Sequence, residues 1–329
     1  MKTCPKCQLR YPNDATYCVV DRADLVPSTD ERIGTLVAKR YLVEEILGEG
    51  GMATVYRARH KNVERPVALK VIQGDLAKDT VVRERFRREA QNARKLAHPN
   101  IIEIFDQGET DDGVPFLVME LLQGETLEDY LEKRGPMPPA LIRTILQHLA
   151  DALDQAHQAG VVHRDLKPSN LFLTTDRKGE PQLKVMDFGI AKVLEAMRQG
   201  TTHSVGTLQY MSPEQIDAAP IDHRSDLWSL AVITFQCLTG ELPFRSEALG
   251  DLLMKIMMAP LPVPSEVAPL PPELDAWWAR AAARDPAQRF QSARELAEAL
   301  ALALGVTRDR GDAAVDTAPR VPPTARSAP

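Results

Sequence analysis

GVVHRDLKPSNLFL, residues 160–173, sets five polar side chains between two short apolar runs. Apolar runs of this kind are usually buried, and burying unpaired charges beside them is costly. Either the polar side chains neutralise one another, or a bound ligand neutralises them. The side chains concerned are those of His163, Arg164, Asp165, Lys167 and Asn170.

A second acidic segment, LKVMDFGIAK (residues 183–192), follows a run that predicts a hairpin with its turn at 177–179. One carboxylate, Asp165, can accept a proton from a hydroxyl group. A second carboxylate, Asp187, can hold Mg²⁺ together with the amide oxygen of Asn170. Lys167 supplies positive charge for a migrating phosphoryl group. Together these are the groups that phosphoryl transfer needs.

The glycine-rich stretch LGEGGMATVY (residues 47–56) lies between two strand-like segments. Because Gly48, Gly50 and Gly51 lack side chains, backbone amides there can approach a phosphate. Hairpins also use glycine for their geometry alone, so this stretch is weak evidence by itself. No GK[ST] sequence follows it, and it is therefore not a Walker loop.

The strand-like stretch RPVALKVIQ (residues 65–73) contains a single lysine, Lys70. Strand alternation places Ala68 and Lys70 on the same face. A lysine in so apolar a strand lies either at a sheet edge or beside an anionic partner. Glu89, in the charged helical stretch 79–96, is the candidate partner, although helices of this charge density mostly carry solvated side chains.

The length of 329 residues is enough for two lobes and short appendages. A hydrophobic content of 44% and a charged content of 26% are ordinary for a globular protein with a large core. The net charge of -6 gives no reason to expect nucleic acid or an anionic membrane as a partner. No apolar run approaches the length of a membrane span, and the N-terminus lacks the apolar core of a secretory signal. We therefore expect a cytoplasmic chain.

Strand signals dominate the first part of the region 39–304, and helices dominate beyond Gly124. Five strands and one charged helix predict a first lobe that ends near residue 122. The helical stretches expected in the second lobe are 138–160, 224–239, 246–258, 272–284 and 292–304. Outside this region, we expect a small cysteine-bearing module at 1–26, a linker at 27–38, and a disordered Pro- and Ala-rich tail at 305–329.

These segments, in this order, resemble the eukaryotic-type (Hanks-type) serine/threonine protein kinases of bacteria. The resemblance covers about residues 41–300, and includes VALK, a helical glutamate, HRDLKPSN, DFG, SPE at 212–214, DLWSL at 226–230 and Arg289 in DPAQRF. It implies an α+β fold of two lobes, with a five-stranded N-lobe carrying one main helix and a mostly helical C-lobe.

The resemblance also implies a role for each site residue. Asp165 would accept the hydroxyl proton, while Asn170 and Asp187 would hold Mg²⁺ or Mn²⁺. Lys167 would steady the γ-phosphate of ATP, and Lys70, positioned by an ion pair with Glu89, would bind the α- and β-phosphates. The other ATP-binding residues implied are Leu47, Gly48, Gly50, Gly51, Val55, Ala68, the gatekeeper Met119, the hinge residues Glu120 and Leu122, and Phe172 in the adenine floor.

Lys167 and Thr207 resemble residues that distinguish serine/threonine kinases from tyrosine kinases. Arg164, directly before Asp165, can pair with a phosphate on the downstream segment 190–206 and so order it. We expect autophosphorylation in that segment, and a kinase homodimer would allow transfer between two copies. The candidate acceptors are Thr201, Thr202 and Ser204; the alternative is that they are only exposed polar loop residues.

Glu214 and Arg289 resemble the structural ion pair of the family, and Asp226 resembles the residue that holds the backbone of the catalytic loop. The sequence departs from the family pattern at three places: Ala53 replaces the last loop glycine, Ala231 replaces a helical glycine, and the stretch between Asn170 and Asp187 is longer than usual. None of these departures changes a group that handles the phosphoryl.

Three of the four cysteines lie near the N-terminus, within CPKCQLRYPNDATYCVVD (residues 4–21). Cys4 and Cys7 have the spacing of a zinc knuckle, and Cys18 with Asp21 resembles the second half of a zinc ribbon whose fourth cysteine is replaced. A Cys₃Asp site is chemically sound, as are a water ligand, a ligand from elsewhere, or a site without metal. So small a module would fold largely on its metal. We expect the fourth cysteine, Cys237, in the core.

The sequence predicts an ATP-dependent serine/threonine kinase that acts on protein substrates in bacterial signal transduction. The alternative is a pseudokinase scaffold that binds nucleotide and recruits partners through the zinc module. Pseudokinases usually lack at least one catalytic residue, whereas all of those named above are present. A small-molecule phosphotransferase is disfavoured by the SPE segment. If the chain is part of a longer membrane-anchored protein, the expected location applies to this portion.

Overall fold

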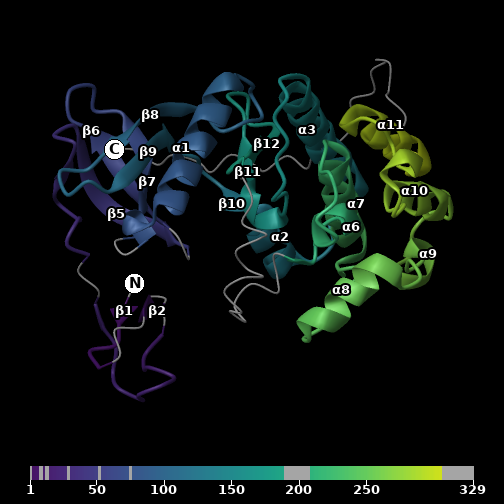
Figure 1. The fold of residues 1–329 in the computed structure, drawn as a ribbon, viewed down its shortest axis with the longest axis horizontal. Helices are drawn as coiled ribbons and strands as arrows, with labels where there is room; N and C mark the ends of the chain where they lie inside the picture. Colours follow the sequence, from purple (N-terminus) through teal and green to yellow (C-terminus); the bar gives the residue numbers. More distant parts are fainter. Residues whose placement is uncertain are drawn as a thin grey trace, which may run out of the picture.

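A curled antiparallel sheet lies at one end of the molecule and a bundle of helices at the other (Figure 1). The computed structural model describes residues 2–6, 10–11, 15–27, 30–50, 53–73, 76–188 and 208–305, apart from a few side chains within this range. Matching the expected order, strands precede most of the helices, and the two lobes meet near residues 120–125.

The N-lobe sheet has six antiparallel strands in the order β4-β5-β6-β7-β9-β8. Side-chain alternation in β7 separates two apolar clusters, since Val67, Leu69 and Val71 pack in the main core of the lobe and Ala68 packs in a smaller cluster on the other face. The strands are β4 (Leu36–Val37), β5 (Tyr41–Glu49), β6 (Ala53–His60), β7 (Pro66–Ile72), β8 (Ile104–Glu109) and β9 (Pro115–Glu120).

The expectation of five strands in this lobe is wrong, because β4 adds a sixth. Strand β4 pairs with β5, with Leu36 opposite Leu42 and Val37 opposite Tyr41. It lies within the stretch 27–38 that we expected to be linker. Three residues, Ala38 to Arg40, join the two strands, and Ala38 and Lys39 have φ values of 48° and 58°. A hairpin turn with two successive positive φ values usually carries Asn-Gly, so this sequence gives no turn signal.

Helix α1 (Thr80–Lys95), after the short η1 (Leu76–Lys78), is the main helix of the N-lobe and contacts β8 and β9. Val82 and Phe86, four residues apart, are both buried in the main core of the lobe. Residues at this spacing lie on the same face of a helix, which explains how a strongly charged helix attaches to the sheet.

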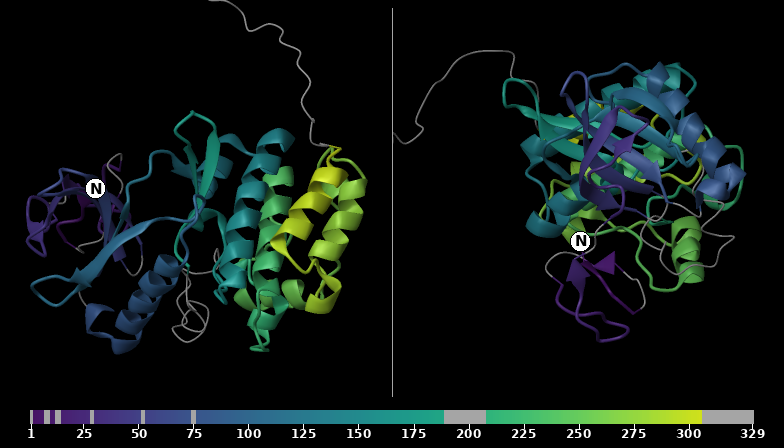
Figure 2. Two further views of the ribbon diagram at one scale, coloured as in Figure 1. Left: turned by 90° about the horizontal axis from the view of Figure 1, so that it is seen from above. Right: turned by 90° about the vertical axis from the view of Figure 1, so that its left-hand side faces the viewer.

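The C-lobe is built around α7 (Arg224–Thr239), which is buried on nearly all sides. Helix α3 (Pro139–Gln158) packs against α7 and α11 (Ala293–Ala303), and Figure 2 shows the three helices side by side. The predicted apolar repeat of α3 is confirmed, since Leu149 and Leu153 are fully buried. The remaining helices are α2 (Leu127–Arg134), α6 (Pro213–Ile216), α8 (Leu249–Met258), α9 (Pro264–Val267), α10 (Glu273–Ala281) and η4 (Pro286–Gln288).

A small sheet between the lobes includes the hairpin that lies between the two predicted cation ligands, Asn170 and Asp187, in the chain. It consists of β10 (Glu125–Thr126), β11 (Leu171–Thr175) and β12 (Pro181–Val185), in that order. The predicted hairpin at 171–186 is β11–β12, with its turn at 176–180. The short η2 (Pro168–Asn170) precedes β11, so the hairpin joins Asn170 at one end to Asp187 at the other.

The N-terminal module has a separate three-stranded sheet in the order β2-β1-β3, purple in Figure 1. Its strands are β1 (Lys2–Thr3), β2 (Arg10–Tyr11) and β3 (Val26–Pro27). Beyond it, Tyr56 of the N-lobe donates a hydrogen bond of 2.8 Å from its hydroxyl to Asp30. Within the described ranges, no helix has both the length and the apolar character needed to cross a bilayer.

Candidate active site

The backbone of the loop 161–167 is held by a buried carboxylate on α7. The carboxylate oxygens of Asp226 accept hydrogen bonds of 2.8 Å from the backbone N–H groups of His163 and Arg164. A third contact, of 2.7 Å, joins the carboxylate to Nε2 of His157 on α3. Burial acts to raise the pKa of Asp226, but the bond to His157, the nearby histidine charges and the backbone donor outweigh it, so the pKa lies below its usual value.

His163 connects the same loop to the segment before Asp187. Its Nδ1 accepts a hydrogen bond of 3.3 Å from the backbone N–H of Asp165. Because Nδ1 is an acceptor, Nε2 carries the proton and donates to the carbonyl of Met186 over 3.0 Å. Both ring nitrogens thus have a partner, and the ring packs against Phe188 with ring centroids 4.9 Å apart.

Asp165, Lys167 and Asn170 form one cluster at the start of β11. Lys167 Nζ lies 3.4 Å from Oδ2 of Asp165. The side-chain amide of Asn170 donates to the backbone carbonyl of Asp165 over 2.7 Å and to its carboxylate over 3.3 Å. The amide nitrogen is therefore used within the loop, and the amide oxygen is the atom left to bind a cation.

Asp187 is brought to the same cluster by the hairpin. The backbone N–H of Met186 donates to the carbonyl of Asn170 over 2.9 Å, so the two predicted cation ligands lie on adjoining strand ends. Asp187 has a left-handed φ of 48°, an uncommon conformation for a non-glycine residue that is often found at functional sites. Its Oδ1 lies 2.7 Å from Lys70 Nζ, which reaches it from β7 in the other lobe.

The donor set fits Mg²⁺ bound to a nucleotide. Mg²⁺ prefers carboxylate and amide oxygens together with phosphate oxygens, and Asp187 and Asn170 offer the first two at one place. The ammonium groups of Lys70 and Lys167 are mostly buried beside these acids, with 13% and 14% of their side chains exposed. Buried positive charges at the edge of the cluster suit the phosphates of the same ligand.

An apolar cluster lies on the face of the sheet toward this site. The structure brings together Ala68 and Met119, both buried, with Val55 and Leu122 partly buried against them. Leu47 is 47% exposed, and Phe172 is partly exposed on β11. Leu121, within the predicted hinge, also packs there, and two members that sequence reasoning missed are Ile102 and Met186. Met186 had a signal, since it directly precedes the aspartate of DFG.

Glu120, the first hinge residue, makes polar contacts that the sequence did not indicate. Its carboxylate lies 2.6 Å from Nζ of Lys184 on β12 and accepts a hydrogen bond of 2.8 Å from the backbone N–H of Glu103. These contacts join the end of β9 to the hairpin that carries Asp187. Glu120 therefore links the lobes at the edge of the candidate nucleotide site.

Several predicted site residues fall outside the described part of the chain. They are Gly51, Cys7, Thr201, Thr202, Ser204 and Thr207, together with the side chain of Glu89. The proposed pair between Lys70 and Glu89 therefore stays a prediction, and so do the phosphorylation sites.

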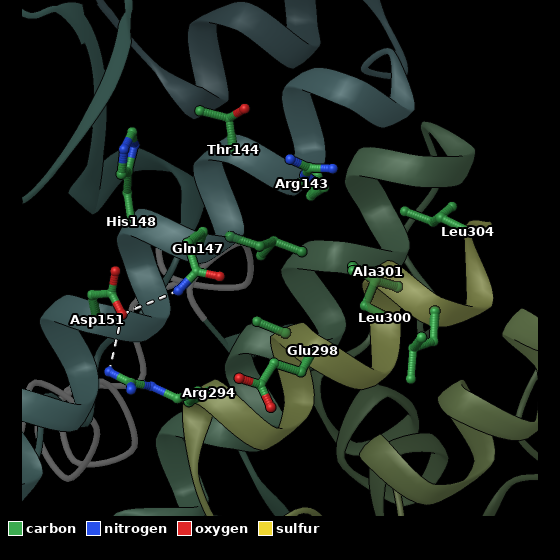
Figure 3. Close-up of a pocket in the computed structure, with 13 residues that line it drawn as sticks. Arg143, Thr144, Gln147, His148, Asp151, Arg294, Glu298, Leu300, Ala301 and Leu304 are labelled. Atoms are coloured by element: carbon green, nitrogen blue, oxygen red, sulfur yellow. Dashed lines mark hydrogen bonds and ion pairs between the residues drawn. The ribbon is translucent and has the colours of Figure 1, made fainter. Parts of the chain in front are cut away.

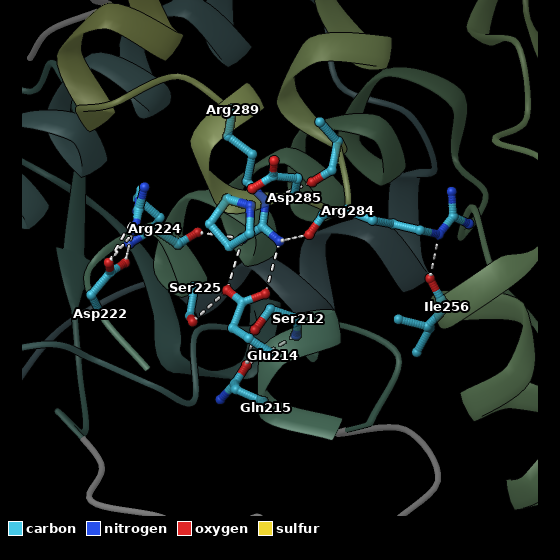
Figure 4. A network of polar contacts seen from close by, with 12 residues as sticks. Ser212, Glu214, Gln215, Asp222, Arg224, Ser225, Ile256, Arg284, Asp285 and Arg289 are labelled. Atoms are coloured by element: carbon cyan, nitrogen blue, oxygen red, sulfur yellow. Dashed lines mark hydrogen bonds and ion pairs between the residues drawn. The ribbon is translucent and has the colours of Figure 1, made fainter. Parts of the chain in front are cut away.

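The ion pair expected between Glu214 and Arg289 is present and fully buried (Figure 4). Two parallel hydrogen bonds of 2.8 Å join the guanidinium to the carboxylate, and the hydroxyl of Ser225 donates a third of 2.6 Å. Burial raises the pKa of Glu214, but the bonds from Arg289 and Ser225 outweigh it, so the pKa lies below its usual value. Next to Glu214, Gln215 donates to the carbonyl of Arg164 over 2.8 Å, which connects this network to the loop before Asp165.

A hollow of about 770 Å³ lies elsewhere on the C-lobe, between α3 and α11 (Figure 3). Its lining includes Arg143, His148 and Asp151 of α3 and Arg294 and Glu298 of α11. None of the predicted catalytic or ATP-binding residues lines it, so its size alone does not mark the site of chemistry.

Three of the candidate zinc ligands in the N-terminal module lie close together. Cys4, Cys18 and Asp21 hold potential ligand atoms within 4.8 Å of one another, and both cysteines are buried. The lone Cys237 is buried in the C-lobe core, as expected, and burial raises the pKa of its thiol to about 12.

Comparison with known proteins agrees with this geometry. A family model described as a protein kinase domain matches residues 41–298. The serine/threonine-protein kinase pkn3 of Myxococcus xanthus is 39% identical over 303 residues, covering 89% of this chain and 54% of pkn3. PknB of Mycolicibacterium smegmatis is 40% identical over 267 residues, covering 79% of this chain and 42% of PknB. The chain thus spans about half the length of these relatives.

Among solved structures, the PknI kinase domain of Mycobacterium tuberculosis superimposes with a TM-score of 0.67 at 32% identity. That match covers 83% of this chain and 98% of the PknI domain. The fold, the order of the motifs and the site geometry all lie within the matched region. The chain therefore belongs to the protein kinase family, and relatives that it resembles at about 40% identity are named serine/threonine-protein kinases of bacteria.

Proposed function

We propose that the chain transfers the γ-phosphoryl group of Mg-ATP to serine and threonine hydroxyls of proteins, as a kinase of bacterial signal transduction. The observation that carries the proposal is one polar cluster assembled from both lobes. Lys70 of the N-lobe contacts Asp187 over 2.7 Å, and Lys167 lies 3.4 Å from Asp165. Relatives at about 40% identity are named serine/threonine-protein kinases, which supports the choice of acceptor.

The residues divide the reaction between them. The substrate oxygen forms a bond to the γ-phosphorus while the bond from that phosphorus to the bridging oxygen breaks, and ADP leaves with that oxygen. Asp165 takes the proton of the attacking hydroxyl. Lys70 holds the α- and β-phosphates, and Lys167 neutralises charge on the group in transfer. Bound Mg²⁺ supplies positive charge between the phosphates, and Asn170 and Asp187 are the residues that would hold it.

The adenine would lie against the apolar cluster of Ala68, Val55, Met119 and Leu122. Leu47, Phe172 and the backbone at Gly48, Gly50 and Gly51 would complete the pocket. The hinge backbone at 120–122 starts at the end of β9 and precedes β10. As the family resemblance implies, it would recognise the edge of the adenine base.

Control by phosphorylation is part of the proposal. Among the described residues, Nε of Arg164 is buried and has no hydrogen-bond partner. A buried guanidinium nitrogen without a partner is costly, and a phosphate on Thr201, Thr202 or Ser204 would satisfy it. One copy of the chain would transfer that phosphate from ATP to the other copy. We also propose a cytoplasmic location for this portion, because its free thiols suit a reducing compartment.

We propose further that residues 1–26 form a zinc-binding module of the zinc-ribbon type. The knuckle spacing of Cys4 and Cys7 and the proximity of Cys18 to Cys4 support it. The module would serve interaction or regulation, since none of the residues described in it contributes to the cluster around Asp165.

The test of the kinase proposal is incubation of the purified chain with labelled ATP and Mg²⁺. We expect label on serine and threonine residues of the chain itself, and its loss in Asp165→Asn. The control is Glu266→Gln, an exposed carboxylate on α9, which should label like the wild type. Nucleotide binding without transfer by the folded wild type would reject the kinase and support a scaffold, and equal labelling of Asp165→Asn would reject the assigned base.

A further inference from the structure

The N-terminal module contains a cluster of ligand atoms that the phosphotransfer site does not use. Cys4 and Cys18 are fully buried, and Asp21 is partly buried beside them. A single carboxylate oxygen, Oδ2 of Asp21, lies 3.4 Å from Sγ of Cys4 and 3.8 Å from Sγ of Cys18. Both thiols donate to this oxygen, so one oxygen faces both sulfurs.

These separations match those of ligands around one tetrahedral metal ion. Zinc lies about 2.3 Å from a cysteine sulfur and about 2.0 Å from a carboxylate oxygen, with tetrahedral angles between ligands. Two such ligands are then about 3.5 Å apart. The observed distances of 3.4 and 3.8 Å lie on either side of this value, and all three ligand atoms lie within 4.8 Å of one another.

The surrounding backbone is arranged to hold the sulfurs as ligands. The N–H of Lys6 points to Sγ of Cys4 at 3.4 Å, and the N–H of Asp21 points to Sγ of Cys18 at 3.3 Å. The hydroxyl of Tyr11 lies 3.0 Å from the same Cys18 sulfur. Hydrogen bonds of this kind fix the orientation of a sulfur ligand.

A tight turn brings Asp21 back to Cys18. The N–H of Cys18 donates to the carbonyl of Ala23 over 2.8 Å, and the N–H of Arg22 donates to the carbonyl of Cys18 over 2.9 Å. Arg22 takes a left-handed φ of 53°, a conformation that costs energy for a residue with a side chain. Metal coordination by the residue just before it would offset that cost.

The described part of the module has little else to hold it together. Its buried cluster consists of Cys4, Cys18 and Leu25, with Tyr11, Ala15 and Ala23 partly buried against them. So small an apolar core does not stabilise a fold of this size without a metal or a disulfide.

We infer that the carboxylate of Asp21 is a metal ligand, and that Zn²⁺ binds between it and the sulfurs of Cys4 and Cys18. The inference rests on the proposed zinc-binding module and assigns the oxygen that takes the place of its missing fourth cysteine. Two thiolates with one carboxylate at tetrahedral spacing select zinc over Mg²⁺ or Ca²⁺, which prefer oxygen ligands alone.

The experiment uses the full chain, stripped of metal and titrated with Co²⁺ as a spectroscopic stand-in, followed by displacement with Zn²⁺. We expect one equivalent of Co²⁺ with the visible absorption of a tetrahedral thiolate site. Asp21→Asn should weaken binding by at least about tenfold. The matched control is Asp24→Asn, an exposed carboxylate three residues away, which should bind like the wild type.

Asp21→Cys tests the same assignment with a variant that keeps a ligand and so keeps the module folded. It should bind Zn²⁺ more tightly and show stronger sulfur-to-cobalt charge-transfer absorption. Equal affinity and spectra in the wild type and in both Asp21 variants would overturn the inference while leaving a zinc module in place. A wild type that binds no metal would overturn both the assignment of Asp21 and the proposed zinc-binding module. Labelling of the same samples with Mg-ATP reports separately on the kinase activity.

Discussion

Asp226 illustrates how a residue with no part in the chemistry can decide whether the chemistry is possible. Only 1% of it is exposed, yet it carries a charge that compensates donors lying 62 to 69 residues earlier in the chain. Arg164, one of those donors, has a left-handed φ of 65°. The strained backbone before Asp165 is therefore stabilised from α7, and the position of Asp165 depends on it.

We predict that Asp226→Asn lowers activity through position. An amide presents one acceptor and one donor, so at least one N–H of the loop loses its partner. Loss of a hydrogen bond to a charged group costs about 1.5–3 kcal/mol, and the free energy of unfolding should fall by at least that much. Urea unfolding measures this loss. Steady-state kinetics should show a reduced kcat with little change in KM for ATP.

The control for this prediction is Asp222→Asn, which removes a more exposed carboxylate that contacts Arg224 over 2.7 Å. A surface pair of this kind contributes about 1 kcal/mol or less. If both variants lost stability and kcat to the same extent, the special role of Asp226 would be rejected.

At the scale of elements, the contact between β10 and β11 joins the hinge region to the catalytic hairpin. Thr126 opposes Phe172 in this pairing, and Gly124 directly precedes β10. Gly124 has a φ of 142°, and a Cβ atom there would lie 2.0 Å from the carbonyl oxygen of Leu173. Only glycine allows the two backbones to approach this closely.

Gly124→Ala should therefore destabilise the chain by about 1–3 kcal/mol, the range for a strained backbone position, because either φ or the strand pairing must change. The comparison is Gly250→Ala in α8, where a Cβ meets nothing within 4 Å and φ is ordinary. That variant should be more stable by about 0.4–1 kcal/mol. Thermal or urea unfolding of both variants checks the prediction. It requires that Gly124→Ala lowers the free energy of unfolding and that Gly250→Ala raises it.

At the scale of the whole molecule, the pair of Glu214 and Arg289 joins parts of the C-lobe that are 75 residues apart. The guanidinium also donates to the carbonyls of Ala283 and Arg224, and it lies 5.1 Å above the ring of Trp228. The segment before Glu214 and the turn before α11 are thereby held against α7. The pair therefore joins three segments of the C-lobe.

Glu214→Gln should lower the free energy of unfolding at neutral pH by about 3–5 kcal/mol, because it leaves the charge of Arg289 buried without its counter-ion. The loss should depend on pH. The pKa of Glu214 in the folded chain lies below its ordinary value of 4.5, so its contribution is fully present above that pH. It is lost as the pH falls through the lowered pKa.

The stability difference between the wild type and Glu214→Gln should therefore shrink as the solution is acidified below pH 4.5. Unfolding measured by circular dichroism over a pH series tests this. Asp251→Asn, an exposed carboxylate paired with Lys255, serves as the control and should show no comparable loss. A difference that stayed constant from neutral to acid pH would contradict the assignment.

The sequence by itself determined the family, the order of the motifs, the limits of most helices and the residue types that handle phosphate. These are local properties: Leu149 and Leu153 repeat at helical spacing, and the groups of HRDLKPSN lie within a few residues of one another. A pattern of side chains along the chain reports such properties directly.

Only the tertiary structure decided which distant groups meet. Strand β4 escaped notice because its turn carries Ala38 and Lys39 in place of the usual Asn-Gly, and two residues are too few for a periodic signal. The contacts of Lys70 with Asp187 and of Glu120 with Lys184 each join segments that no spacing rule connects. Such contacts depend on how the elements pack, because packing, and not sequence distance, sets the separation of two side chains.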